Sequence, residues 1–372
     1  MLRTGLVIAL LLAALTSGGA AEKTKEKPMN APVVLPNVDR YRVTEPMFEG
    51  VRVILNARGE KYSPAYVQGT SGAAFRIAGP CPCAPTCEAK QWPGDLIKLF
   101  GYETESIGLG PEPAKSLPAM LDRIKTEVRA GRPVLVWNAF TYAEFDVVCG
   151  FDEEKHELLG RGSYGNMRGA DYARAPENRV TACEGYPALG AITVGKKVKE
   201  FDARAAELDA LRDAVAHAHG LSTTLPGMPS GLRCYDAWIQ SYQKRGTLTQ
   251  AKSRDEKQDL GWVKVLPPDD AYPLGIYAST HEAAAGFLKE IAPKYPEAAP
   301  YLELASEHFA KDAAALVAAG AVLGDRKSEP TEEQCARVAS HLSEARAMYA
   351  LAIDEIAAAL RKIGGPKSNA GI

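Results

Sequence analysis

The spacing of hydrophobic positions predicts one long amphipathic helix in the first half of the chain. Within residues 117–130 the apolar side chains recur every three or four positions, at Leu117, Met120, Leu121, Ile124 and Val128. This helix is expected to end at Gly131, and Pro133 then favours an extended backbone. Residues 95–100 also have a helical pattern, whereas residues 51–55 fit a helix or a strand.

Short runs of β-branched and aromatic residues predict several strands after this helix. They occupy residues 134–137, 145–149, 157–159 and 191–194. A helix followed by strands that are joined by turns is typical of the α+β class. We therefore expect an antiparallel sheet in a domain that spans residues 33–199.

The second half of the chain has a helical pattern throughout. Long segments rich in Ala, Leu, Glu and Arg predict helices at residues 201–219, 233–244, 279–291, 299–319 and 331–363. Proline-containing connections separate them. Residues 200–366 are therefore predicted to form a helical bundle domain, followed by a disordered tail at residues 367–372.

The N-terminal segment is typical of a cleavable signal peptide. Arg3 precedes the apolar run Leu6–Leu15, and small residues follow up to Ala21. We expect residues 1–21 to be removed and residues 22–32 to form a flexible leader. The mature protein is then secreted or periplasmic, without an integral membrane segment.

Composition narrows the possible partners. The 372 residues carry a net charge of -2, and no basic stripe interleaves with aromatic residues. Nucleic acid is therefore not an expected partner, and no cofactor motif is present. The expected partner is a small molecule or peptide.

Seven cysteines follow the predicted signal peptide, which makes disulfides possible in an oxidising compartment. Cys81, Cys83 and Cys87 form the densest cluster, for which a disulfide-linked loop is favoured, with Cys183 as a long-range partner. Three soft metal ligands or a redox pair are the alternatives, but no fourth ligand lies nearby, so no metal is predicted. Cys149 lies in an apolar strand and is expected to be a buried, inert thiol.

The first domain resembles the N-terminal domain of the butirosin biosynthesis protein H family, a branch of the papain-like C39 group. The resemblance rests on four pieces, which are Asn37–Tyr41 through Phe48–Gly50, Tyr62–Arg76, Gly131–Val134 and Val147–Asp152. It implies a papain-like fold with a Cys nucleophile near the start of the first helix, a His base at the start of a strand, and an Asp on the following strand.

The residues at these catalytic positions do not match the chemistry that the resemblance implies. The nucleophile position lies near Glu49 and Gly50, the base position at Glu144, and the third position near Gly162. A triad mechanism needs a thiolate, an imidazole and an orienting carboxylate. We therefore expect a protein that lacks papain-like catalysis and binds its ligand in the former catalytic cleft.

Five residues are candidates for ligand binding in that cleft: Glu49, Gln68, Trp137, Glu144 and Asp146. Glu144 and Asp146 share one face of a strand because side chains alternate. They form an acidic pocket opposite Glu49 or, as we favour, a polar strand edge that faces solvent. Two other functions stay open, which are a cysteine hydrolase or acyltransferase with a displaced nucleophile and an interaction module of the cell envelope.

Overall fold

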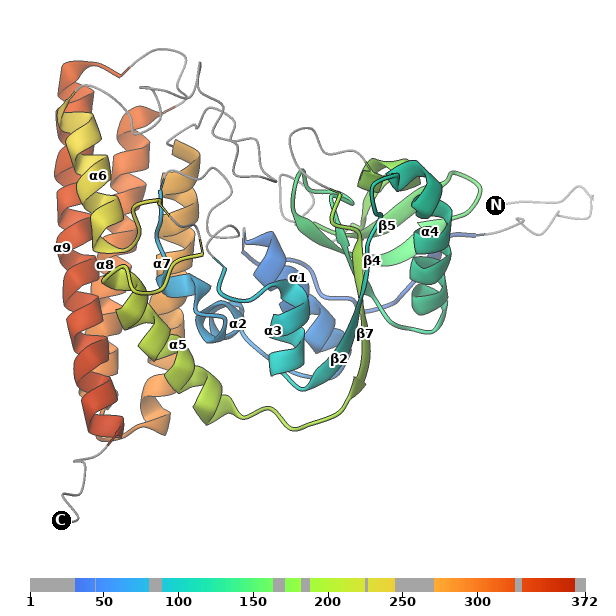
Figure 1. The fold of residues 1–372 in the computed structure, drawn as a ribbon, viewed down its shortest axis with the longest axis horizontal. Helices are drawn as coiled ribbons and strands as arrows, with labels where there is room; N and C mark the ends of the chain where they lie inside the picture. The colour runs from blue at the N-terminus through green and yellow to red at the C-terminus, as the bar shows by residue number, and fades with distance from the viewer. Residues whose placement is uncertain are drawn as a thin grey trace, which may run out of the picture. The chain divides into compact units, whose positions relative to one another are not determined.

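The chain folds into an antiparallel sheet with helices on both faces, followed by an all-helical region, as the computed structural model shows (Figure 1). The structure describes residues 31–43, 45–79, 89–162, 171–181, 188–224, 227–244, 271–324 and 330–364. The predicted α+β class is therefore confirmed. The predicted signal peptide at 1–21, almost all of the leader at 22–32 and the tail at 367–372 lie outside these residues.

Within the described residues the sheet has seven strands. They are β1 (Val33–Val34), β2 (Tyr102–Ile107), β3 (Val134–Trp137), β4 (Phe145–Asp152), β5 (Glu157–Arg161), β6 (Ala173–Pro176) and β7 (Ala191–Lys197). Their order is β2-β7-β3-β4-β5-β6, and every neighbouring pair is antiparallel. Strand β1 pairs with the second half of β4, beyond the residues that β3 contacts.

The predicted helices are present, but α2 was not predicted and α7 begins earlier than expected. Those before or between the strands are α1 (Pro46–Ala57), α2 (Pro64–Thr70), α3 (Pro93–Leu99) and α4 (Pro113–Arg129). Those after the sheet are α5 (Ala203–Ala218), α6 (Leu232–Gln243), α7 (Ala271–Ile291), α8 (Ala299–Leu323) and α9 (Glu332–Ile363). Helix α9 begins with a capping box, in which Thr331 and Gln334 each accept a backbone N–H from the other residue.

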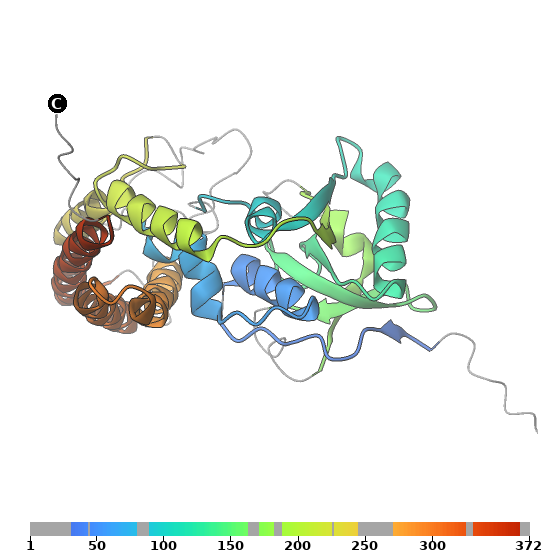
Figure 2. The same ribbon diagram turned by 90° about the horizontal axis from the view of Figure 1, so that it is seen from below.

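The two faces of the sheet pack against different helices because side chains alternate along each strand. Helix α4 covers one face, whose buried residues include Val134, Val136 and Val148. Helices α1 and α3 cover the other face, whose buried residues include Leu135, Phe145 and Val147 (Figure 2). Both faces of β3 and β4 are therefore apolar, which explains why these strands appear in the sequence as continuous hydrophobic runs.

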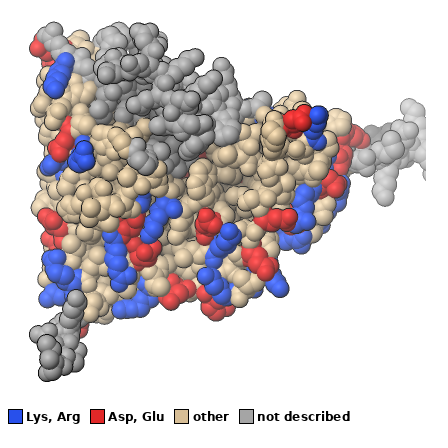
Figure 3. All heavy atoms as spheres, viewed as in Figure 1, with Lys and Arg blue, Asp and Glu red and all other residues tan. Residues whose placement is uncertain are grey.

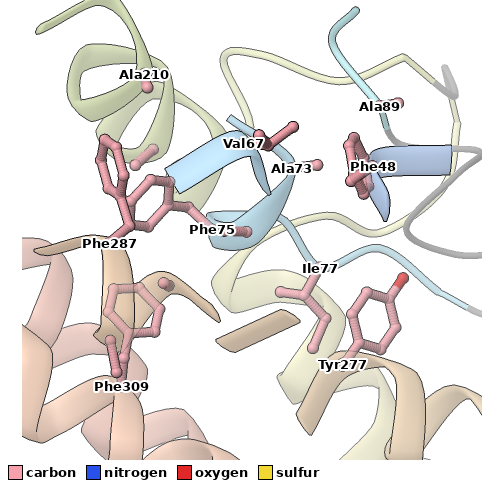
Figure 4. Close-up of a cluster of buried hydrophobic side chains, with 14 of the residues drawn as sticks. Phe48, Val67, Ala73, Phe75, Ile77, Ala89, Ala210, Tyr277, Phe287 and Phe309 are labelled. Carbon is pink, nitrogen blue, oxygen red and sulfur yellow. The ribbon is translucent and has the colours of Figure 1, made fainter. Parts of the chain in front are cut away.

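The core on the α1 face continues into the C-terminal helices. Phe75, in a short 3₁₀ helix at Ala73–Phe75, contacts the rings of Phe287 on α7 and Phe309 on α8 (Figure 4). Gly69 on α2 permits this approach, since a Cβ atom there would lie 2.1 Å from Phe287 Cγ. Apolar side chains from before and after residue 200 thus share one core, and the predicted domain boundary at residue 199 stays a prediction.

Charges of both signs are interspersed on the face that Figure 3 shows. None of the helices in the described ranges is long and apolar enough to span a bilayer. Nor do those ranges contain a group of three or more His, Cys, Asp or Glu residues arranged to hold a metal ion.

Candidate functional site

The start of helix α1 lies against the start of strand β4, so the predicted nucleophile and base positions belong to one region of the structure. Gly50 marks the contact. A Cβ atom there would lie 2.7 Å from Leu135 Cδ2, 2.9 Å from the hydroxyl of Tyr41 and 3.7 Å from the carbonyl oxygen of Phe145. A side chain at position 50 would therefore require Leu135 and Tyr41 to shift.

Glu49 is held in a buried ion pair. The guanidinium of Arg52 donates to both of its carboxylate oxygens, at 2.6 and 2.9 Å, and the backbone N–H of Arg42 donates to Oε2 at 2.5 Å. A further N–H of Arg52 reaches Asp39 at 2.6 Å. Burial opposes the charge of Arg52, but its two carboxylate partners raise its pKa above the usual value. Glu49 thus anchors the segment before α1. Both oxygens of its carboxylate are engaged by the protein, so they are not available to a ligand.

Glu144 and Asp146 are buried, and the prediction that they form a solvent-facing strand edge is wrong. The turn between β3 and β4 contains Glu144 and folds over Asp146. Asp146 Oδ2 accepts the backbone N–H groups of Phe140 at 2.6 Å and Thr141 at 2.7 Å, and so fixes that turn. Burial raises the pKa of Asp146 to about 7, against the effect of these hydrogen bonds.

Gln68 and Trp137 are buried with polar atoms that lack hydrogen-bond partners. Neither amide atom of Gln68 has a partner within the described ranges, and the same holds for the indole Nε1 of Trp137. The Trp137 ring packs edge-on against Phe145, with centroids 5.0 Å apart. Trp137 therefore helps to fix the position of the Phe145 ring.

An aromatic cleft opens on the other side of Phe145. Trp92, the residue before α3, packs edge-on against Phe145 with centroids 6.3 Å apart and is 39% exposed. The cleft has a volume of about 290 Å³. Its lining combines apolar and polar residues, which are Trp92, Gly94, Asp95, Lys98, Ser106, Phe145, Leu189 and Ile192. We refer to these residues as the aromatic cleft.

The cleft was not predicted from the sequence, and of the five candidates none lines it directly. Trp137 contacts Phe145, which lines the cleft. The other four are Glu49, Gln68, Glu144 and Asp146, which are all buried. Trp92 is a single exposed indole before a proline-initiated helix, and no periodic pattern marks it.

Glu45 introduces an unusual carboxyl group at the same end of α1. It immediately precedes the helix, is 2% exposed, and its Oε1 has no hydrogen-bond partner among the described residues. Burial alone raises its pKa to about 8. Burial therefore favours the protonated, neutral form of Glu45 near neutral pH.

The thiols that the structure describes are not arranged for catalysis at this site. Cys149, Cys234 and Cys335 are buried thiols. Burial raises the pKa of the Cys149 thiol to about 12, so the predicted inert character of Cys149 has physical support. Gly162 is buried after β5. The disulfide candidates Cys81, Cys83, Cys87 and Cys183 lie outside the described residues, so their pairing stays a prediction.

Comparison of the chain with protein-family models and with curated proteins finds no match. The resemblance to the butirosin biosynthesis protein H family therefore rests on the residues quoted above and stays a prediction.

Proposed function

We propose that this protein binds a small molecule or peptide by inserting an aromatic or branched apolar group into the aromatic cleft. The observation that carries the proposal is the exposure of Trp92 beside Phe145 at the mouth of a hollow of about 290 Å³. This volume is at the lower end of the range for ligand pockets. It suits one ring or one large side chain better than a whole drug-sized molecule.

The composition of the cleft supports the same conclusion. Phe145, Leu189 and Ile192 offer apolar surface, and an aromatic group gains both burial and ring contacts against Trp92. The ion pair between Asp95 and Lys98, at 3.1 Å, lies at the rim, where it orients polar parts of a ligand. These features are those of a binding site with a few polar groups around an apolar centre.

Binding without papain-like catalysis is the second part of the proposal. A nucleophilic side chain at position 50 would displace Leu135 and Tyr41, and Glu49 is bound to Arg52. The arrangement of α1 on β3 and β4 is the kind that the papain-like resemblance implies, which supports our placing the site at this end of the sheet. Export through the predicted signal peptide belongs to the same proposal.

Saturation-transfer NMR tests the proposal with two matched probes, N-acetyl-L-phenylalaninamide and N-acetyl-L-glutaminamide. We expect transfer to the phenyl ring and much less to the glutamine side chain. Trp92→Ala should weaken the binding of the phenylalanine probe about tenfold, because it removes one ring contact.

The matched control is Tyr142→Ala, since Tyr142 is an aromatic residue of similar exposure, 44%, that does not line the cleft. This variant should bind as the parent does. Absence of transfer to the phenyl probe, or equal transfer in Trp92→Ala, would count against the proposal.

A further inference from the structure

A second hollow, of about 630 Å³, lies farther along strand β7 and has a different character. Four cationic side chains line it: Arg58, Arg123, Arg132 and Lys196. They come from the C-terminal end of α1, from α4, from the residue before Pro133 and from β7. We refer to this hollow as the arginine groove.

The groove exists because β3 is short. Strand β3 begins at Val134 and pairs with β7 at Ala191 and Ile192. In the part of the chain that the structure describes, β7 therefore has no strand partner beside Val194 on the edge that faces β3. Arg58 fills part of the gap, and its Nη2 donates a hydrogen bond to the carbonyl oxygen of Val194.

Two of the arginines share a buried carboxylate. Glu127 on α4 is 5% exposed and accepts from Arg132 at 2.5 Å, while Arg123 lies 3.3 Å from its other oxygen. Arg123 also bonds to Glu105 at 2.8 Å. The hydrogen bond from Arg132 lowers the pKa of Glu127, and the charges of Arg132, Arg123 and Arg58 lower it further, so this carboxyl is ionised.

Arg58 has no carboxylate of its own. Within the described residues no acidic group lies within ion-pair distance of its guanidinium, and its buried Nε has no hydrogen-bond partner. Burial lowers the pKa of Arg58, and the nearby charge of Arg132 lowers it further. The guanidiniums of Arg132 and Arg123 thus pair with the buried carboxylate of Glu127, and the charge of Arg58 is the least compensated of the three.

We propose that the arginine groove binds a small oxyanion, the carboxylate or phosphate group of a ligand, between the guanidiniums of Arg58 and Arg132. Planar guanidinium groups bind such anions through paired N–H donors. An anion there supplies the missing negative charge beside the guanidinium of Arg58. The remaining volume of the groove accommodates the rest of the ligand. This site is separate from the aromatic cleft, and its existence does not depend on the function proposed there.

The test is titration of the full mature chain with sodium phosphate and, separately, with sodium acetate at low ionic strength, followed by NMR or calorimetry. We expect saturable binding of at least one probe below about 10 mM, weakened by added sodium chloride. Tighter binding of phosphate points to a phosphorylated ligand, and tighter binding of acetate to a carboxylic acid. Arg58→Gln should weaken binding about tenfold or more, because a charged donor pair is lost.

Two further variants serve as controls for the titration. Arg129→Gln, on α4 but outside the groove, removes the exposed pair with Glu153 and the cation–π contact with Phe151, and should leave binding unchanged. Glu103→Gln removes an exposed carboxylate from the groove itself and should tighten binding several-fold, a gain that misfolding does not produce. The proposal is overturned if neither probe saturates, or if folded Arg58→Gln binds as tightly as the parent.

Discussion

The hydroxyl of Tyr41 donates a hydrogen bond of 3.2 Å to the carbonyl oxygen of Phe145, at the point where helix α1 meets the sheet. Burial raises the pKa of Tyr41 well above its usual value, and the charges of Asp146, Glu49 and Glu144 raise it further. The phenol therefore stays protonated and acts as a donor. A structural contact thus occupies the place where the papain-like resemblance implies catalytic groups.

This contact makes the glycine at position 50 essential for packing. Gly50→Ala places a methyl group 2.7 Å from Leu135 Cδ2 and 2.9 Å from the Tyr41 hydroxyl. We expect a loss of about 1–3 kcal/mol in the free energy of unfolding, typical of an overpacked core. Urea denaturation followed by circular dichroism measures it.

The matched control is Gly275→Ala, in helix α7. A Cβ atom at Gly275 meets no atom within 4 Å. This substitution should stabilise the protein by about 0.5–1 kcal/mol, because alanine favours a helix more than glycine does. If both variants change stability equally, the contact at Gly50 is not as tight as described.

The elements predicted best are those whose burial follows a simple period. Helix α4 buries Met120, Ile124 and Val128 on one side, and β3 is buried on both faces, so both were visible in the sequence. Strand β2 was missed, because it lies at the edge of the sheet and four of its six residues, including Glu103 and Glu105, are polar. Such strands form through pairing with a partner, which here is β7, rather than through their own hydrophobicity.

The site was harder to predict, because its walls come from distant segments. Trp92 meets Phe145 across 53 positions of sequence, and neither residue carries a motif. The orientation of Asp146 was mispredicted because strand alternation says which face a side chain is on, not what covers that face. The backbone of the β3–β4 turn supplies donors to Asp146, which period-based reasoning does not anticipate.

Glu45 should give the protein a stability that decreases as pH rises. Its pKa of about 8 in the folded protein lies above the ordinary value of 4.5, so the folded state holds a proton more tightly than the unfolded chain. Stability is therefore lost as pH rises through the window from 4.5 to about 8, by about 1.4 kcal/mol for each unit of difference. Asp146, with a pKa of about 7, acts in the same direction.

Glu45→Gln isolates this contribution, because glutamine stays neutral at every pH. At pH 5 the variant and the parent should have similar free energies of unfolding, and at pH 8 the variant should be more stable by a few kcal/mol. Glu154→Gln, which changes an exposed carboxyl, serves as the control and should follow the parent throughout. A variant that keeps the full pH slope of the parent would show that Glu45 is hydrated or ionised.

Cys149 should resist alkylation in the folded protein. Its thiol is buried, so the reagent cannot reach it. Its pKa is raised to about 12, so very little of the reactive thiolate is present at pH 8. Brief treatment with iodoacetamide, followed by mass spectrometry, should find Cys149 unlabelled before denaturation and fully labelled after it. Rapid labelling in the native state would contradict the burial of β4.

The link between the segment after α2 and helix α5 should depend on one buried ion pair. Asp213 accepts from the Nε and Nη2 atoms of Arg76, each at 3.0 Å, and also from the hydroxyl of Ser222 at 2.7 Å. The side chains of Arg76 and Asp213 are 1% and 6% exposed. Removing the carboxylate leaves a buried cation with much less compensation.

Asp213→Ala should therefore destabilise the protein by about 3–5 kcal/mol, the range found when one partner of a buried pair is removed. Asp209→Ala is the control on the same helix, because Asp209 is 59% exposed and pairs only with Lys90 among the described side chains. It should cost no more than about 1 kcal/mol. Denaturant titration of both variants decides the matter, with Asp213→Asn as a milder change in case the alanine variant does not fold. Equal losses at the two positions would mean that solvent screens the pair between Arg76 and Asp213.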